Sequence, residues 1–212
     1  MNSNLNDYIL SHIDPEPEHL NRLYRDTNLH LLYPHMCSGH LQGRVLRMIT
    51  SMIAPRHVLE LGTYSGYSAL CMAEALADDA CSVDTIEIDD EAENFIRNHL
   101  RESSVGNRVN LIIGDATEVV PTLPRDYQLV FIDANKRQYV QYYQLVFPHV
   151  VKGGFIIVDN TLWDSKVSEQ ENHDALTDGV RAFNDYVAAD TRVSRVILPL
   201  RDGLTIIQKL TD

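Results

Sequence analysis

The 212-residue sequence lacks any long hydrophobic run and has little positive charge. No apolar stretch approaches the roughly 18 residues that a membrane-spanning helix needs. The opening segment MNSNLNDYILSHI has neither a basic start nor a continuous apolar stretch, unlike a signal peptide. The 18 Lys and Arg against 30 Asp and Glu give a formal net charge of −12, whereas nucleic acid binding requires clustered positive charge. We therefore expect a cytoplasmic protein that binds neither nucleic acid nor membrane.

Cysteine is also scarce. Cys37, Cys71 and Cys81 are odd in number and have no C-x-x-C spacing, which excludes a disulfide framework and a zinc site of that type. We expect each to be a small buried residue. The sequence also lacks repeats and low-complexity tracts, and its 44% hydrophobic content is that of a globular protein. One domain over residues 1–212 is the expected organisation.

Five short runs rich in Val, Ile, Leu and Phe lie beyond residue 56, without the polar alternation of a half-exposed strand. They are HVLELG, SVDTIEI, RVNLIIG, YQLVFID and GFIIVD. Such runs are typical of strands buried on both faces of a parallel sheet. Residues 65–78, 90–104 and 136–147 lie between them and carry apolar residues at helical spacing. The alternation predicts an α/β fold with a doubly wound, Rossmann-like sheet.

The two ends of the chain depart from this alternation. The C-terminal stretch RVSRVILPLRDGLTIIQKL has apolar runs around an Asp-Gly turn, which predicts an antiparallel hairpin, with Pro199 marking an edge or a bulge. Residues 2–12, 17–32 and 39–53 have helical patterns and predict a cap, residues 1–53, on the core, residues 56–212. The third helix should bury a stripe formed by Leu41, Val45, Met48, Ile49 and Met52. The connection 34–43 lies where it could cover a bound ligand.

The strand HVLEL leads directly into the segment ELGTYSGYS, residues 60–68. Glycines between a strand and a helix let the backbone approach a ligand closely. The segment departs from the G-x-G-x-x-G spacing that suits a pyrophosphate, and Glu60 would be an unfavourable neighbour for a phosphate. A cationic ligand such as S-adenosylmethionine, with its sulfonium and amino groups, fits this charge better.

Acidic residues follow the next two strands. Glu87 ends SVDTIE about 20 residues after Gly66, near the offset for ribose recognition in nucleotide-binding α/β folds. We assign the ribose to Glu87 ahead of Asp89 and Asp90, and we expect Asp90 to begin the next helix. Asp115 follows the third strand, where it would accept from an adenine amino group, cap a helix, or do both.

Oxygen-bearing side chains also end the fourth and fifth strands. Asp133 ends YQLVFID, and Asp159 and Asn160 end GFIIVDN. Because the carboxyl ends of neighbouring parallel strands meet at one edge of a sheet, these side chains should converge. All-oxygen ligation suits Mg²⁺, Mn²⁺ or Ca²⁺ rather than zinc. Taken alone, the residues fit a metal site and simple loop caps equally well.

Three segments, VLELGTYSGYSAL, VFIDANKRQY and IIVDNTLW, occur together in the order and spacing of a known family. From about Met36 to the C-terminus the chain resembles the metal-dependent class I O-methyltransferases of the caffeoyl-CoA O-methyltransferase group, and more distantly catechol O-methyltransferase. The resemblance implies a Rossmann-like methyltransferase fold and S-adenosyl-L-methionine as methyl donor. It also implies a divalent cation such as Mg²⁺, a small catechol-like or phenolic acceptor, and a homodimer.

The resemblance implies roles for individual residues. The donor would contact Ser38, Glu60, Gly62, Thr63, Ser68, Glu87 and Ala116, and Gly66, Asp115 and Asp133 complete the predicted donor pocket. The metal ligands would be Asp133, Asp159 and Asn160. The acceptor would contact Trp163 and Asp164. One departure is Asn135, where many caffeoyl-CoA enzymes carry a second acid.

Lys136 matches the proposed proton acceptor of the catechol enzymes, next to Asp133 in FIDANK. A surface lysine at a helix start is the alternative. A neighbouring cation and desolvation would favour the neutral amine that a base requires. In the expected mechanism the metal holds two adjacent hydroxyls and stabilises the ionised form of one, which attacks the methyl carbon in line with the sulfur.

Two other functions fit parts of the pattern. A nicotinamide-dependent oxidoreductase has a similar order of elements, and Glu87 would serve either ribose, but the third glycine is missing. A non-catalytic binding module could keep the same fold, since fold does not establish activity.

Overall fold

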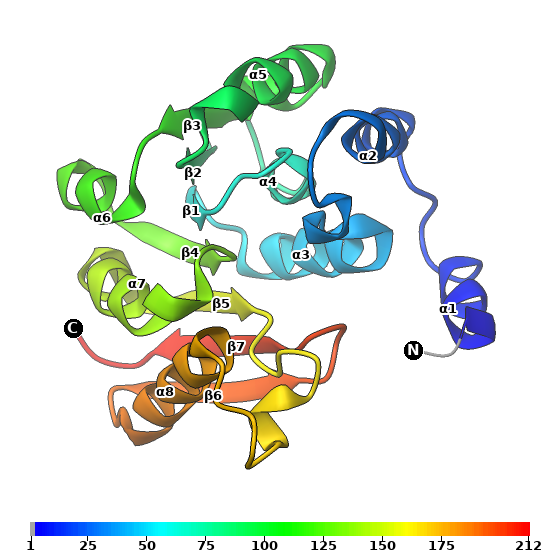
Figure 1. Cartoon of the computed structure of the whole chain (residues 1–212). Coiled ribbons are helices and arrows are strands. Elements are labelled where there is room, and N and C mark those ends of the chain that lie inside the picture. Colours follow the sequence, from blue (N-terminus) through cyan, green and yellow to red (C-terminus); the bar gives the residue numbers. More distant parts are fainter. Residues whose placement is uncertain (1–2) are drawn as a thin grey trace.

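The computed structural model describes residues 3–212, and Figure 1 shows one twisted sheet flanked by helices. The strands are β1 (His57–Leu61), β2 (Ser82–Glu87), β3 (Val109–Ile113), β4 (Tyr127–Ile132), β5 (Val150–Asp159), β6 (Val193–Leu198) and β7 (Leu204–Lys209). Their order in the sheet is β3-β2-β1-β4-β5-β7-β6. The first five strands pair in parallel, and β7 runs antiparallel to both β5 and β6. The predicted doubly wound sheet with a C-terminal antiparallel pair is confirmed.

The helices follow the predicted alternation with one addition. They are α1 (Ser3–Leu10), α2 (Glu18–His30), α3 (Gly39–Ile53), α4 (Tyr67–Ala73), α5 (Glu93–Glu102), α6 (Ala116–Val119), α7 (Tyr139–Val146) and α8 (Ala175–Ala189). The expected helices 90–104 and 136–147 each begin with a 3₁₀ turn, Asp90–Ala92 and Lys136–Gln138. The first predicted helix started at Asn2, which lies outside the described residues. Sequence analysis did not predict α8.

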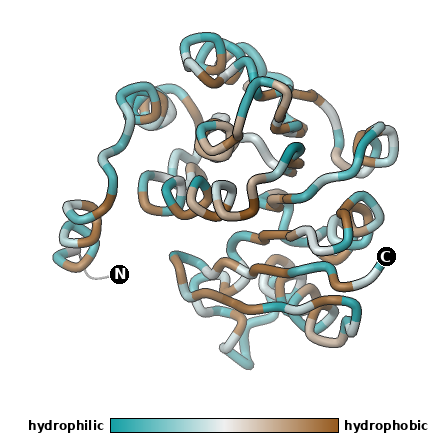
Figure 2. The backbone as a smooth tube through the Cα atoms, turned by 180° about the vertical axis from the view of Figure 1, so that it is seen from behind, coloured by the Kyte–Doolittle hydropathy of each residue, from teal (hydrophilic) through white to brown (hydrophobic). Residues whose placement is uncertain are grey.

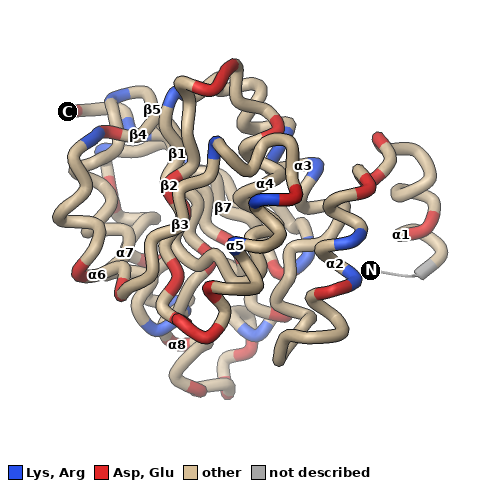
Figure 3. Tube along the Cα trace, turned by 90° about the horizontal axis from the view of Figure 1, so that it is seen from above, with Lys and Arg blue, Asp and Glu red and all other residues tan. Residues whose placement is uncertain are grey.

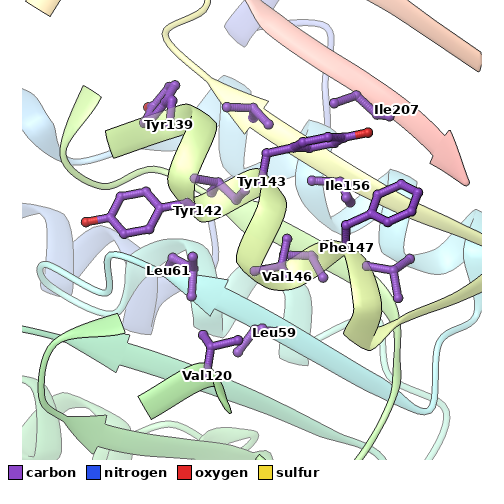
Figure 4. Packing of buried hydrophobic residues seen from close by; sticks show 14 of the residues in the cluster. Leu59, Leu61, Val120, Tyr139, Tyr142, Tyr143, Val146, Phe147, Ile156 and Ile207 are labelled. Carbon is purple, nitrogen blue, oxygen red and sulfur yellow. The ribbon is translucent and has the colours of Figure 1, made fainter. Parts of the chain in front are cut away.

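The core lies on both faces of the sheet because side chains alternate along each strand. On β1, Leu59 and Leu61 pack against α7, and Figure 4 shows Leu61 beside Val146 and Leu59 below it. Val58 points to the opposite face, where α3 and α4 cover the sheet. The apolar colour of the central strands in Figure 2 reflects this burial on two sides. Each fully buried side chain of this size contributes roughly 1.5–3 kcal/mol.

The apolar stripe predicted for α3 is correct only in part, because Val45 and Ile49 pack against the core but the two methionines do not. Met48 and Met52 are 52% and 77% exposed, and the helix instead buries Gln42, Gly43, Leu46 and Thr50. The cause is the close approach of α4. A Cβ atom at Gly43 would lie 2.7 Å from the Cys71 sulfur and 2.8 Å from the Tyr67 ring, so this face of α3 admits only small residues at that point.

The predicted cap is smaller than expected. Figure 1 shows α1 set apart from the other helices, and its Leu5 and Tyr8 are exposed. The segment after α1 rejoins the body through the carbonyl of Asp14, which bonds to the His40 ring, and through Glu16, which accepts from the Tyr67 hydroxyl. Only α2 and α3 therefore act as the cap over α4.

The C-terminal hairpin places a turn next to the carboxyl end of β5. Its connection, 199–203, includes Pro199, so Pro199 lies outside the first strand, and β6 forms the edge of the sheet. Gly203 has a φ of +93°, and a Cβ atom there would lie 2.6 Å from the backbone nitrogen of Leu162. This close contact fixes the hairpin turn against the segment that follows β5.

The surface agrees with the composition. Figure 3 shows Lys and Arg scattered among acidic residues over many elements. Within residues 3–212, no helix has both the length and the apolar character to cross a membrane. The three cysteines are buried and unpaired, as expected.

Candidate active site

The loop between β1 and α4 is held against the end of β4. Gly62 has a φ of +94°, and a Cβ atom there would lie 2.1 Å from the carbonyl oxygen of Asp133. The Asp133 amide also donates to the carbonyl of Leu61 at 2.9 Å. Only glycine allows this approach, so the motif predicted to bind the donor and the first predicted metal ligand occupy one place in the fold.

Glu60 is fully buried at the end of β1. Its Oε2 accepts from the Thr85 hydroxyl at 2.5 Å, and the Thr85 hydroxyl is also hydrogen-bonded to the Thr63 hydroxyl at 2.5 Å. Its Oε1 is buried and has no hydrogen-bond partner among the described residues. Burial raises the pKa of Glu60 to about 8, and the charges of Asp133 and Glu87 add to the increase, whereas the hydroxyls of Ser68 and Thr85 oppose it. A buried unpaired oxygen of this kind favours a donor group or a cation nearby.

Glu87 is almost buried at the end of β2, where its carboxylate is held by backbone amides. The amide of Tyr64 donates to Oε2 at 2.6 Å, and the amide of Asp89 donates to Oε1 at 2.9 Å. The next helical turn begins at Asp90, as predicted, but its N-cap side chain is that of Asp89. Glu87 therefore faces the loop between β1 and α4, while Asp89 and Asp90 belong to the start of the next helical turn.

The other predicted donor residues lie on neighbouring elements. Ser38, Thr63, Ser68 and Ala116 are buried, and Gly66 is the N-cap of α4 with a φ of +86°. Asp115 caps α6 and accepts from the amide and the hydroxyl of Thr117, both at 2.7 Å. The helix-cap interpretation of Asp115 is thus confirmed.

The ends of β4 and β5 bring two carboxylates together. Asp133 accepts from the Lys136 ammonium at 2.8 Å, and both side chains are mostly buried. Asp159 is 3% exposed and accepts from the backbone amide of Asn160 at 2.8 Å. Burial and the charge of Asp133 raise the pKa of Asp159, against hydrogen bonds from Gln42 and the Asn160 amide. This mutual repulsion is the electrostatic condition that a divalent cation relieves.

The donor set fits a hard cation by its chemistry. Asp133, Asp159 and Asn160 supply two carboxylates and an amide, all oxygen ligands. Asn160 has a φ of +56°, which turns the chain directly after β5. Across residues 3–212, no three His, Cys, Asp or Glu side chains gather to form a metal site, and the side-chain oxygen of Asn160 is the third ligand that the sequence predicts here.

The segment after β5 carries the predicted acceptor contacts. Trp163, Asp164 and Ser165 all have positive φ, between 46° and 62°. The Trp163 indole nitrogen is buried and has no hydrogen-bond partner among the described residues, and its ring lies 5.9 Å from Lys136 Nζ. Asp164, the next residue, is exposed. The structure thus places the Trp163 ring beside Lys136, and the role of Asp164 as an acceptor contact stays a prediction.

Helix α8 holds this segment in place. The Arg181 guanidinium donates to the carbonyls of Lys166, Val167, Glu169 and Asn172. Asn184 donates to the carbonyl of Thr161 at 2.8 Å. Non-glycine residues at positive φ cost free energy, and bonds of this number can hold them.

Sequence analysis missed three residues that shape the site. Gln42 and Arg201 contact each other at 2.8 Å, and Gln42 donates to Asp159 at 2.6 Å. Arg181 lies on the helix that was not predicted. One signal was present: Gln42 is a polar residue within the apolar pattern of 39–53. The contacts of the two arginines span many residues and leave no local signal.

Comparison with known proteins agrees with this geometry. The O-methyltransferase family profile matches residues 10–210, so the similarity also covers much of the N-terminal part that the motifs left out. The caffeoyl-CoA O-methyltransferase of Stellaria longipes is 31% identical, over 97% of this chain and 90% of the relative. The catechol O-methyltransferase of Niastella koreensis is 29% identical, over 75% of this chain and 73% of the relative.

Solved structures share the same architecture. The O-methyltransferase of tomaymycin synthesis from Streptomyces achromogenes, in complex with SAM, superposes with a TM-score of 0.91 and 25% identity, over 98% of this chain and 96% of the other. The family match and the sheet order both indicate the same family. The chain belongs to the O-methyltransferase family.

Proposed function

We propose that the protein transfers the methyl group of S-adenosyl-L-methionine to a hydroxyl of a small catechol-like or other phenolic acceptor, assisted by a divalent cation such as Mg²⁺, Mn²⁺ or Ca²⁺. The observation that carries the proposal is the contact between the Gly62 loop and Asp133. It joins the predicted donor pocket to the carboxylates at the ends of β4 and β5. A methyl group and an acceptor hydroxyl would meet there.

The donor would lie along the loop after β1. Glu87, oriented by two backbone amides, would accept from the ribose hydroxyls. Glu60 has a buried unpaired oxygen that would face the positive part of the donor. The SAM bound to the Streptomyces achromogenes structure supports the same ligand here.

The chain's own residues would orient the acceptor and take its proton. Lys136 lies between Asp133, at 2.8 Å, and the rings of Tyr139 and Trp163, at 5.7 and 5.9 Å. We assign to its amine the acceptance of the acceptor's hydroxyl proton. The hydroxyl oxygen then bonds to the methyl carbon, and the electron pair of the broken carbon–sulfur bond stays on sulfur.

Asp133, Asp159 and Asn160 would hold the cation. A divalent cation held there would supply positive charge that lowers the cost of ionising an acceptor hydroxyl. Its presence beside Asp133 would also weaken the hold of that carboxylate on the Lys136 proton. Positioning by the Trp163 segment and exclusion of water by its buried surroundings would supply further rate.

The acceptor and the cation are tested in one assay. Radiolabelled methyl donor is supplied with a set of catechols, and each catechol is matched to the same ring with a single hydroxyl. We expect label transfer to the catechols, loss of transfer after exhaustive chelation, and recovery on adding Mg²⁺ or Mn²⁺. Equal transfer to the single-hydroxyl partners, or full activity after chelation, would contradict the proposed acceptor geometry or the metal role.

The remaining expectations belong to the same proposal. The protein would act in the cytoplasm as a homodimer, without nucleic acid or membrane partners. Membership in the O-methyltransferase family argues against the oxidoreductase alternative. A non-catalytic module would bind S-adenosylhomocysteine without transferring label to any acceptor, so the same assay separates it from an enzyme.

A further inference from the structure

Gln42 connects the cap to the carboxylate at the end of β5. It lies near the start of α3 and is 1% exposed. Its side-chain nitrogen donates to Asp159 Oδ2 at 2.6 Å, between residues 117 positions apart in the sequence. The backbone amide of Asn160 donates to the other oxygen, Oδ1, at 2.8 Å. The Asp159 carboxylate is therefore fixed at both oxygens.

Arg201 determines which way the Gln42 amide points. One guanidinium nitrogen donates to Gln42 Oε1 at 2.8 Å and also to the carbonyls of Cys37 and Ser38. A guanidinium group has donors only, so it requires the amide oxygen on its own side. The NH₂ group must then face Asp159. Without Arg201 the amide could rotate and direct its oxygen at the carboxylate.

We infer that Gln42 is a positioning residue for the Asp159 carboxylate and that Arg201 fixes the orientation of its amide. The inference rests on the proposed role of Asp159 as a metal ligand. A ligating carboxylate held by a neutral donor keeps its charge and has one orientation, which lowers the ordering cost when a cation binds. Arg201 also binds the Ser38 carbonyl. The hairpin turn therefore holds both the Asp159 carboxylate, through Gln42, and the segment just before α3.

The test is the binding of Mn²⁺ to the full-length, chelator-treated protein. The free Mn²⁺ concentration is measured by electron paramagnetic resonance, in the absence of methyl donor and methyl acceptor. The Gln42→Met variant keeps the side-chain length but removes the NH₂ group that donates a hydrogen bond to Asp159. We expect its Mn²⁺ affinity to fall by about tenfold or more, as for other residues that orient metal ligands. The control is Met48→Ala, on the exposed side of the same helix, which should bind Mn²⁺ as the wild type does.

Turnover gives a second readout. In Gln42→Met the cation concentration for half-maximal turnover should rise by the same factor as the Mn²⁺ dissociation constant, while kcat at saturating cation stays within about threefold. A general structural defect would instead lower kcat and the melting temperature together. Affinity for S-adenosylhomocysteine without cation should not change.

Arg201→Gly is the second variant. Arg201 has a φ of +48°, which glycine adopts without strain, so this change removes the guanidinium without disturbing the turn. We expect a smaller loss of Mn²⁺ affinity in the same direction. A folded Gln42→Met protein with wild-type Mn²⁺ affinity would overturn the inference, as would unchanged affinity in Arg201→Gly if Gln42→Met does not fold. Methyl transfer by a wild type that binds no Mn²⁺ would instead refute the metal part of the proposed function, and this inference with it.

Discussion

The proposed donor half and the proposed acceptor half of the site are built in different ways. The donor half, around the ends of β1 and β2, consists of one continuous strand–loop–helix, and its key groups are held by backbone amides and buried hydroxyls. Glu87, for example, accepts from the amides of Tyr64 and Asp89. The acceptor half, beyond β5, is a loop whose residues 163–165 have positive φ. Side chains from α3, α8 and the C-terminal hairpin hold it.

Because the two halves are held by different contacts, we expect substitutions in one half to affect one kind of binding and not the other. The proposed donor recognition depends on strand ends that are part of the core, so its geometry is tied to the stability of the sheet. The proposed acceptor recognition depends on a few long-range side chains, of which Arg181 is an example. Substitutions in the second set should therefore alter acceptor or metal binding while leaving donor affinity intact.

We expect the largest effect on turnover without an effect on donor affinity at Lys136. Removing the proposed base in Lys136→Ala should lower kcat by roughly 10²–10⁴-fold with donor affinity nearly unchanged, and should alter the rising limb of the pH–rate profile. Lys166→Ala is the matched control, because Lys166 Nζ lies 5.8 Å from the Trp163 ring, almost as Lys136 does, but forms no contact with Asp133. A near-normal kcat and pH profile in Lys136→Ala would leave deprotonation to the cation and solvent.

On the donor side, Glu87→Ala should weaken S-adenosylhomocysteine binding about tenfold to a hundredfold, since a charge-assisted hydrogen bond contributes roughly 1.5–3 kcal/mol. Calorimetric titration measures the effect. Asp89→Ala serves as control, because its side chain caps the next helical turn and should leave donor affinity near that of the wild type. Equal losses in both variants would mean that loop structure, and not ribose recognition, sets the affinity.

On the acceptor side, Arg181→Ala should raise the KM for the acceptor by about tenfold, because its bonds to four carbonyls order the loop. Donor affinity should stay within about twofold. Arg192→Ala, which removes an ion pair to Asp190 away from the site, is the control in steady-state kinetics. A parallel loss of donor affinity in Arg181→Ala would show that the two halves are not independent.

The last expected effect concerns folding and not activity, and it is the pH dependence of stability from Glu60. Its pKa is raised from 4.5 to about 8, so the folded protein keeps a proton that the unfolded chain loses. This contribution is fully present below pH 4.5 and is lost as the pH rises through the folded value. Urea unfolding of the donor-free protein should show a decline of at most about 1.4 kcal/mol per pH unit from this group, and Glu60→Gln should flatten it. Identical pH slopes in the two proteins would refute the assignment.

The sequence was sufficient for the sheet because its patterns are local. Strand runs such as YQLVFID are buried on both faces, and the glycines of the 60–68 segment mark the turn between β1 and α4. The hairpin was predictable from Asp202-Gly203, with Gly203 at positive φ. Patterns that extend over only a few residues are enough to predict such features.

Tertiary contacts determine the rest. The exposed Met48 and Met52 could not be predicted, because the close approach of α4 at Gly43 selects which face of α3 is buried. The link from Arg201 through Gln42 to Asp159 joins three distant segments, and only the fold brings them together. The divided helices at 90–104 and 136–147 reflect short 3₁₀ turns that helical spacing does not distinguish.

We propose that the carboxylates at the ends of β4 and β5 hold a cation needed for methyl transfer but not for donor binding. The most direct measurement is turnover of the chelated protein against added Mg²⁺, in the wild type and in Asp159→Ala, with S-adenosylhomocysteine affinity measured on the same samples. We expect the wild type to recover activity with Mg²⁺, Asp159→Ala to remain inactive at every concentration, and both to bind S-adenosylhomocysteine within about threefold of each other, since removing one of three ligands leaves a hard ion poorly held. Activity of the chelated wild type without added cation, or a Mg²⁺ response in Asp159→Ala equal to that of the wild type, would contradict the claim.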